Sequence, residues 1–137
     1  MNPTLSSLSI ALLCILSFGC AGKQMVPVSD VHTVVGRWDG VVEKRPLLAR
    51  RGPVSLTIRE DSVYIYVGVD FWDDRLISGT GQLAIRDGRL YMEEDERHAV
   101  LTLHKRGDEE VLIVEATNAA GKKFHVDLSR SLSPPLP

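Results

Sequence analysis

The sequence predicts an all-β protein, a single small antiparallel eight-stranded up-and-down barrel. Apolar and polar residues alternate along eight short stretches, which is the period of strands with one buried face. Turn-forming pairs such as Asp87-Gly88 and Gly107-Asp108 separate these stretches, and no stretch has the helical period. A closed sheet has no exposed edge, so a barrel accommodates such strands most simply. A two-sheet β-sandwich is the alternative.

The alternation defines the residues that we expect to face inward. They are Val34, Gly36, Trp38, Gly40 and Val42; Val54, Leu56 and Ile58; Val63, Ile65 and Val67; Ile77, Leu83 and Ile85; Leu90 and Met92; Ala99, Leu101 and Leu103; Leu112, Val114 and Ala116; and Phe124, Val126 and Leu128. This inward face is almost wholly apolar, so any cavity is expected to suit an apolar ligand. In the alternative, the same side chains fill the barrel and leave a solid scaffold.

The run from Ser78 to Gly81 has the glycine spacing of a phosphate loop. No predicted helix follows it to hold an anion, so a phosphate site is not expected. Gly79 and Gly81 share the inward parity of Leu83. We therefore expect these two glycines to let the sheet bend sharply.

The first twenty residues contain no Lys, Arg, Asp or Glu, and an apolar core there is followed by small residues up to Cys20. This is the pattern of a secretory signal and is too short and too serine-rich for a membrane-spanning helix. Leu16, Ser17, Gly19 and Cys20 resemble the processing site of bacterial lipoproteins. The resemblance implies cleavage after residue 19, a diacylated Cys20 and attachment to a membrane. An uncleaved signal anchor is the alternative.

In the lipoprotein family, a residue other than Asp after the cysteine implies sorting to the outer membrane, and Ala21 occupies that position. The resemblance therefore implies a cell-envelope protein that is lipid-anchored in the outer membrane and faces the periplasm. Cys14 would be removed with the signal, so no disulfide is expected. The predicted organisation is a signal peptide at 1–19, a lipidated tether at 20–32, a β-barrel domain at 33–130 and a proline-rich disordered tail at 131–137.

Gly36-Arg-Trp38 lies in the first predicted strand, ahead of seven further strand-like stretches. This arrangement resembles the lipocalin and wider calycin families, whose first strand carries Gly-X-Trp near the closed end of the barrel. In those families a basic residue after the last strand packs over the tryptophan. The resemblance implies that Trp38 and Arg130 form such a structural pair at one end of the barrel.

In a meander, alternate connections lie at the same end of the barrel, and the longer connections here share one end. Function is more often found on such loops than on the scaffold. Leu47 and Leu48 lie between cationic residues, and Phe71 and Trp72 lie between acidic ones. We expect these four residues to contact a ligand or partner; in the alternative, they pack back on the barrel mouth. The acidic run 93–96 is expected to be a solvated hairpin tip.

The charges exclude an electrostatic nucleic-acid binder, because 16 Lys and Arg are balanced by 18 Asp and Glu. No Ser/His/Asp or Cys/His arrangement and no clustered metal ligands stand out, so we expect no catalytic residue, metal or cofactor. The sequence therefore predicts a membrane-anchored, non-catalytic binding module for a small apolar ligand. The alternative is a scaffold for protein–protein interaction in the cell envelope, as an assembly factor or inhibitor.

Overall fold

The computed structural model describes residues 22–43, 51–69, 76–94, 97–117, 121 and 123–132. In this part of the chain, eight antiparallel strands close into an up-and-down barrel, and one further short strand is added to it. The strands are β1 (Gln24–Val26), β2 (Gly36–Glu43), β3 (Arg51–Ile58), β4 (Val63–Val69), β5 (Leu76–Arg86), β6 (Arg89–Glu94), β7 (Arg97–Arg106), β8 (Glu109–Thr117) and β9 (Lys123–Arg130). The predicted all-β barrel is confirmed.

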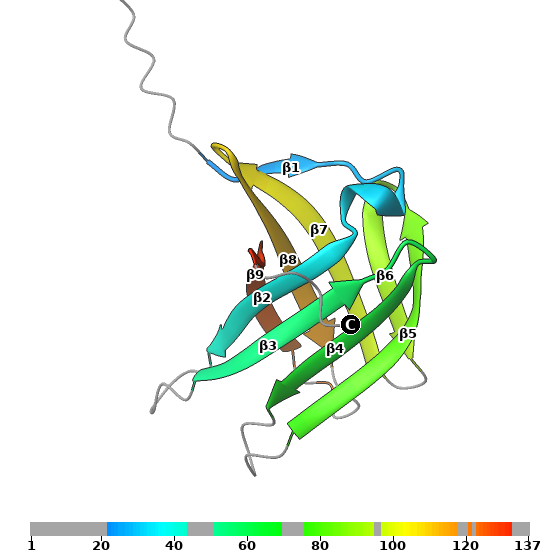
Figure 1. Ribbon diagram of the computed structural model, residues 1–137, viewed down its shortest axis with the longest axis vertical. Coiled ribbons are helices and arrows are strands. Elements are labelled where there is room, and N and C mark those ends of the chain that lie inside the picture. The colour runs from blue at the N-terminus through cyan, green and yellow to red at the C-terminus, as the bar shows by residue number, and fades with distance from the viewer. Residues whose placement is uncertain are drawn as a thin grey trace, which may run out of the picture.

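Each strand from β2 to β8 pairs with the next strand along the chain, as Figure 1 shows. The ring closes where β9 pairs with β2, through the register Trp38↔Arg130, Asp39↔Ser129 and Gly40↔Leu128. This seam has three residue pairs, whereas β7 and β8 share nine. Closure therefore depends on few backbone contacts.

The tight turns β3–β4, β5–β6 and β7–β8 lie at the end of the barrel where β2 begins. In the β5–β6 turn, Asp87 and Gly88 have φ angles of 51° and 72°. Positive φ at both central residues is the requirement of a type I′ turn, which Asp-Gly meets at low cost. Strands β2, β4, β6 and β8 all end at the opposite end.

Part of the segment predicted as a tether, residues 20–32, has regular structure and packs against the barrel from Gln24 onward. Strand β1 pairs with β7 beyond the point where β6 begins, with Val26 opposite Leu103. The Val28 amide donates to the Gly88 carbonyl at 2.9 Å, and a 3₁₀ turn, η1 (Val31–Thr33), follows. Val28 and Val31 are buried in the core. Their burial explains why this segment docks across the tight-turn end (Figure 1).

The core fills the half of the barrel nearest the tight turns. Its fully buried large side chains come from seven strands and the residues before β2: Val28, Val34, Trp38, Ile58, Tyr64, Leu90, Leu101, Leu112 and Leu128. The inward faces that the sequence predicts for most strands are therefore confirmed.

Strand β4 differs from the prediction, because it presents its other face to the interior. Tyr64 is fully buried, whereas Ile65 and Val67 are 40% and 39% exposed on the outside. Both parities of this strand are apolar, so alternation alone did not determine its face. The register decides it, since Tyr64 and Tyr66 lie opposite Gly81 and Gly79 of β5. The two glycines leave room for the two rings.

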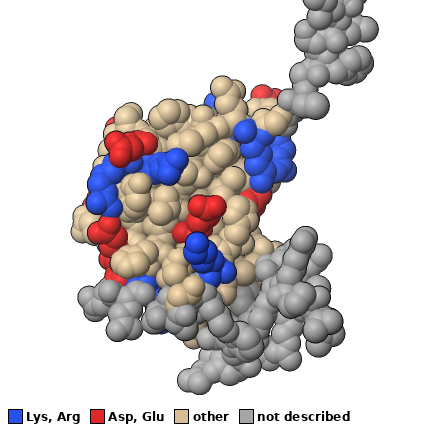
Figure 2. All heavy atoms as spheres, turned by 180° about the vertical axis from the view of Figure 1, so that it is seen from behind, with Lys and Arg blue, Asp and Glu red and all other residues tan. Residues whose placement is uncertain are grey.

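Acidic and basic side chains are interspersed on the barrel surface. Figure 2 shows both signs side by side on the face seen there, with broad uncharged areas between them. Lys23 pairs with Asp127, and Arg59 pairs with Asp61 at 3.0 Å. No large field of one sign covers the described residues on this face, which agrees with the near-neutral composition.

Arg130 packs over Trp38 at the seam between β9 and β2. Its guanidinium carbon lies 4.4 Å from the centre of the Trp38 ring. Its nitrogens donate to the Val35 carbonyl at 2.9 Å and the Thr33 carbonyl at 2.5 Å, and to Glu110 at 2.5 Å. One side chain thus joins β9, β8, η1 and the start of β2, combining a cation–π contact with charge-assisted hydrogen bonds.

Replacing Arg130 with methionine is expected to lower the free energy of unfolding by about 2 kcal/mol, because the carbonyls of Thr33 and Val35 and the Glu110 carboxylate lose their donor. Arg59→Met is the matched control, since it removes only an exposed ion pair, and should change stability by less than about 0.5 kcal/mol. Urea unfolding of both variants checks this. Equal losses would contradict the role of Arg130 in closure.

Candidate functional site

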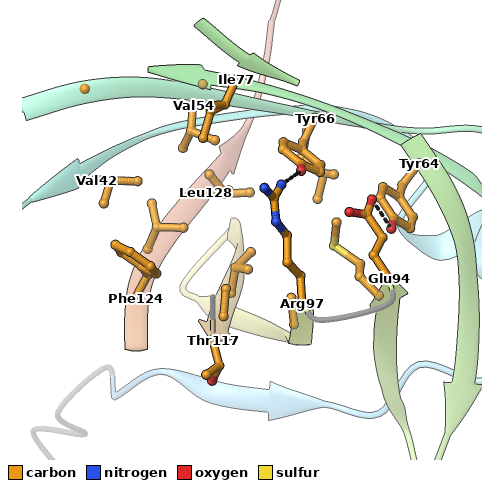
Figure 3. Close-up of a pocket in the computed structure, with 18 of the residues that line it drawn as sticks. Val42, Val54, Tyr64, Tyr66, Ile77, Glu94, Arg97, Thr117, Phe124 and Leu128 are labelled. Carbon is orange, nitrogen blue, oxygen red and sulfur yellow. Dashed lines mark hydrogen bonds between the residues drawn. The ribbon is translucent and has the colours of Figure 1, made fainter. Parts of the chain in front are cut away.

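A cavity of about 460 Å³ occupies the half of the barrel away from the tight turns. Most of its lining is aliphatic or aromatic, as Figure 3 shows for Val42, Val54, Ile77, Phe124 and Leu128. The volume lies within the range of roughly 300–1,000 Å³ that is usual for small-molecule sites. The barrel is therefore not packed along its whole length.

Small residues explain why this half is hollow. Gly52, Gly68, Ala99 and Ala116 line the cavity, and Ala99 lies directly opposite Ala116 across β7 and β8. At the other end, leucines and Trp38 occupy the interior instead. An eight-stranded barrel is just wide enough for its side chains to fill, so small side chains leave space.

Tyr64 and Glu94 form one polar contact in the cavity wall. The Tyr64 hydroxyl donates to Oε1 of Glu94 at 2.9 Å, as drawn in Figure 3. Burial of the ring, together with the hydrogen bond to the carboxylate, raises the pKa of Tyr64. This hydroxyl therefore stays protonated at neutral pH and serves as a fixed donor to Glu94.

Tyr66 and Arg97 form a second polar contact beside the first. Nη1 of Arg97 donates to the Tyr66 hydroxyl oxygen at 3.0 Å. Figure 3 shows the Arg97 side chain extending from the start of β7 into the cavity to reach this hydroxyl. The rings of Tyr64 and Tyr66 lie nearly parallel, with 6.4 Å between their centres and 18° between their planes. Strand β4 thus supplies one hydroxyl to each charged residue.

The two tyrosines depend on the glycines opposite them. A Cβ at Gly81 would lie 2.4 Å from the Tyr64 hydroxyl oxygen, and one at Gly79 would lie 2.4 Å from the Tyr66 ring. Real Cβ atoms do not approach so closely, so any side chain at either position must displace a ring. The glycines predicted to bend the sheet therefore also make space for these two tyrosines.

One expectation about this region is wrong. The run 93–96 was expected to be a solvated tip, but Glu94 lines the cavity, while Glu93 pairs with Arg86 on the outside; residues 95 and 96 lie outside the described residues. Glu94 is half-buried and Arg97 is exposed, and both line the cavity, although no charged side chain among the described residues is fully buried. Alternation places Glu94 on the parity of Leu90 and Met92, which explains its inward position.

Comparisons with protein-family models, curated proteins and solved structures found no match to this chain.

The function therefore has to be argued from the site itself. Within the described ranges, no group of three or more His, Cys, Asp or Glu side chains is arranged to hold a metal ion. None of the helical structure described there is long and apolar enough to cross a membrane. The described arrangement offers an apolar space with one carboxylate and one guanidinium in its wall.

Some of the predicted site residues lie apart from this cavity, and the others are not among the residues that the structure describes. Cys20, Leu47, Leu48, Phe71 and Trp72 are not among the described residues. Trp38 and Arg130 lie in contact at the β2–β9 seam and do not line the cavity. The roles of Cys20 as lipid anchor and of the four loop residues as contact residues stay predictions.

Sequence reasoning missed Tyr64, Tyr66, Glu94 and Arg97. One signal for the tyrosines was available, because two inward glycines on one strand require large side chains on the strand beside it. For Glu94, the parity of β6 was such a signal, but the surrounding acidic residues favoured solvation. Arg97 gave the same kind of signal, since it shares the inward parity of Ala99 and Leu101.

Replacing Gly81 with alanine is expected to lower the free energy of unfolding by about 1–3 kcal/mol, because the new methyl group collides with Tyr64. Gly68→Ala is the matched control, since its Cβ would meet no atom closer than 3.6 Å. This control substitution should lower the free energy of unfolding by less than about 1 kcal/mol. Thermal and urea unfolding check both variants; equal stability of the two would contradict the predicted crowding.

Proposed function

We propose that the protein is a membrane-anchored, non-catalytic binding protein of the cell envelope that holds a small, largely apolar molecule in a lipocalin-like barrel. The observation that carries this proposal is the cavity of about 460 Å³, lined mainly by aliphatic and aromatic side chains. Transfer of an apolar molecule from water into such a space is favourable in proportion to the apolar area buried.

The architecture supports binding rather than a purely structural role. Side chains of Leu83, Leu90 and Leu101 fill the tight-turn half, so large residues are used where packing is needed. In the other half, Ala99 and Ala116 face each other across two strands and leave the space open. If the barrel were selected only for stability, larger side chains would be expected to fill this space, because an empty cavity lowers the free energy of unfolding.

The proposed anchor is a lipid on Cys20, which would attach the protein to the outer membrane on its periplasmic side. The support is the uncharged apolar opening that ends at Gly19-Cys20. Strand β1 begins at Gln24 and lies at the tight-turn end of the barrel (Figure 1). With a lipid on Cys20, this geometry favours an orientation in which the cavity end points away from the membrane.

Cys20→Ser is expected to abolish incorporation of an alkyne-labelled fatty acid into the protein in cells, because the serine lacks the thiol that the lipid requires. Cys14→Ser is the matched control and should retain the label. The fatty-acid label is detected by click chemistry on each immunoprecipitated variant. Label that persists in Cys20→Ser would contradict the anchor.

A second candidate function is contact with another envelope protein, and one observation favours it. The outward faces of β2, β4 and β5 carry exposed apolar residues, with Val41 at 49%, Val67 at 39% and Leu76 at 73% exposure. Exposed apolar residues that lie together mark interaction surfaces. Photocrosslinking from position 67 in cells tests this candidate; capture of no defined protein would count against it.

Ala116→Phe is expected to abolish binding of N-phenyl-1-naphthylamine, a neutral apolar probe, because the ring occupies the cavity. Binding to the purified full chain is measured by energy transfer from tryptophan to the probe. The stability of this variant should be equal to or above that of the unmodified protein, since a void is filled.

Glu115→Phe provides the matched control for this experiment. Glu115 is exposed on the outer face of the same strand, next to Ala116, so the added ring leaves the cavity unchanged and binding should persist. Failure of the unmodified protein to bind the probe, or equal binding by Ala116→Phe, would overturn the proposed cavity function.

A further inference from the structure

We infer that the cavity selects a ligand whose polar end has no net charge and carries a hydrogen-bond acceptor beside a donor, as a primary amide does. The inference rests on the proposed function and specifies the chemical class of ligand. It comes from the two opposite charges in the cavity wall, which are neighbours but do not bind each other.

Glu94 and Arg97 lie directly opposite each other in the register of β6 and β7. Among the described residues, neither forms an ion pair; each is held instead by a tyrosine hydroxyl of β4. Figure 3 shows the two side chains entering the cavity from the same side and diverging toward their tyrosines. A negative and a positive group are thus kept adjacent and separate.

Both groups retain hydrogen-bonding capacity toward the cavity. A guanidinium has five N–H donors, and Arg97 uses one of them on Tyr66. A carboxylate has two oxygens, and Oε1 of Glu94 accepts from Tyr64. Arg97 therefore offers donors to an acceptor, and Glu94 offers an oxygen to a donor. A head group with an acceptor next to a donor satisfies both at once.

The charge balance disfavours an ionic head group. An anion placed on Arg97 would lie close to the carboxylate of Glu94, and a cation placed on Glu94 would lie close to Arg97. Glu94 is half-buried and Arg97 is exposed, so the repulsion is least screened near Glu94, where it offsets the attraction of an anion to Arg97. A neutral head group gains both hydrogen bonds without either repulsion.

The remaining wall suits an apolar tail. Val42 and Phe124 lie across the cavity from the two charged residues in Figure 3. A chain that starts at the Glu94 and Arg97 wall therefore extends toward aliphatic and aromatic side chains. The predicted ligand is amphipathic, with one neutral polar end and one apolar tail.

Three ligands that share a ten-carbon chain test the inference, namely decanamide, decanoate and decylammonium. Each displaces N-phenyl-1-naphthylamine from the purified full chain, and the displacement gives its affinity. We expect decanamide to bind about tenfold more tightly than either ion. This ratio of affinities corresponds to the net free energy of one or two hydrogen bonds. Equal or tighter binding of decanoate or decylammonium would overturn the inference.

Charge removal should abolish the preference for decanamide over one of the two ions. Glu94→Gln leaves Arg97 without an acidic neighbour among the described residues that line the cavity, so decanoate is expected to gain about tenfold relative to decanamide. Arg97→Gln likewise leaves Glu94 without an arginine or lysine among those residues, so decylammonium should gain by the same factor. Glu93→Gln is the matched control, because Glu93 pairs with Arg86 outside the barrel, and it should leave the order unchanged. Variants that all keep the original order would contradict the inference.

The experiment separates this inference from the proposed function. If the probe binds and Ala116→Phe blocks it, but the three head groups compete equally, the cavity function stands and the head-group selectivity is wrong. If the probe does not bind at all, the proposed function itself is wrong. Binding with the predicted order supports both.

Discussion

Closure of the barrel between β9 and β2 is the contact on which the rest of the structure depends. The seam has three residue pairs, and Arg130 reinforces it by covering Trp38 and donating to carbonyls of the segment before β2. Closure removes both sheet edges and encloses the interior. The cavity exists only because the last strand returns to the first, so the cavity depends on the seam, and Leu128 belongs to both.

A change in side-chain size along the barrel axis divides this interior into two parts. At the tight-turn end, large apolar side chains and the docked residues Val28 and Val31 form a close-packed core. Toward the other end, glycine and alanine leave space, and paired tyrosines hold a carboxylate and a guanidinium at its wall. The packed half stabilises a fold in which the hollow half is free to serve binding.

The sequence predicted the eight barrel strands because alternation and turn chemistry act locally. It did not predict β1, since a three-residue strand is stabilised by the exposed edge of β7 rather than by its own pattern. It assigned the wrong face to β4 because Val63–Val69 is apolar at both parities, and only the pairing with Gly79 and Gly81 decides between them. Glu94 and Arg97 were missed because composition does not show which charged residues of a hairpin turn inward.

The central claim is that the barrel binds an apolar molecule inside its cavity. Nuclear Overhauser effects between decanamide and methyl-labelled valine and isoleucine test it most directly, because inward and outward methyl groups alternate along the strands. The account predicts contacts from the decyl chain to Val114 and Val126, which line the cavity, and none to Ile65 or Val67 on the outside. Contacts confined to Ile65 and Val67, or no contacts at all, would contradict it.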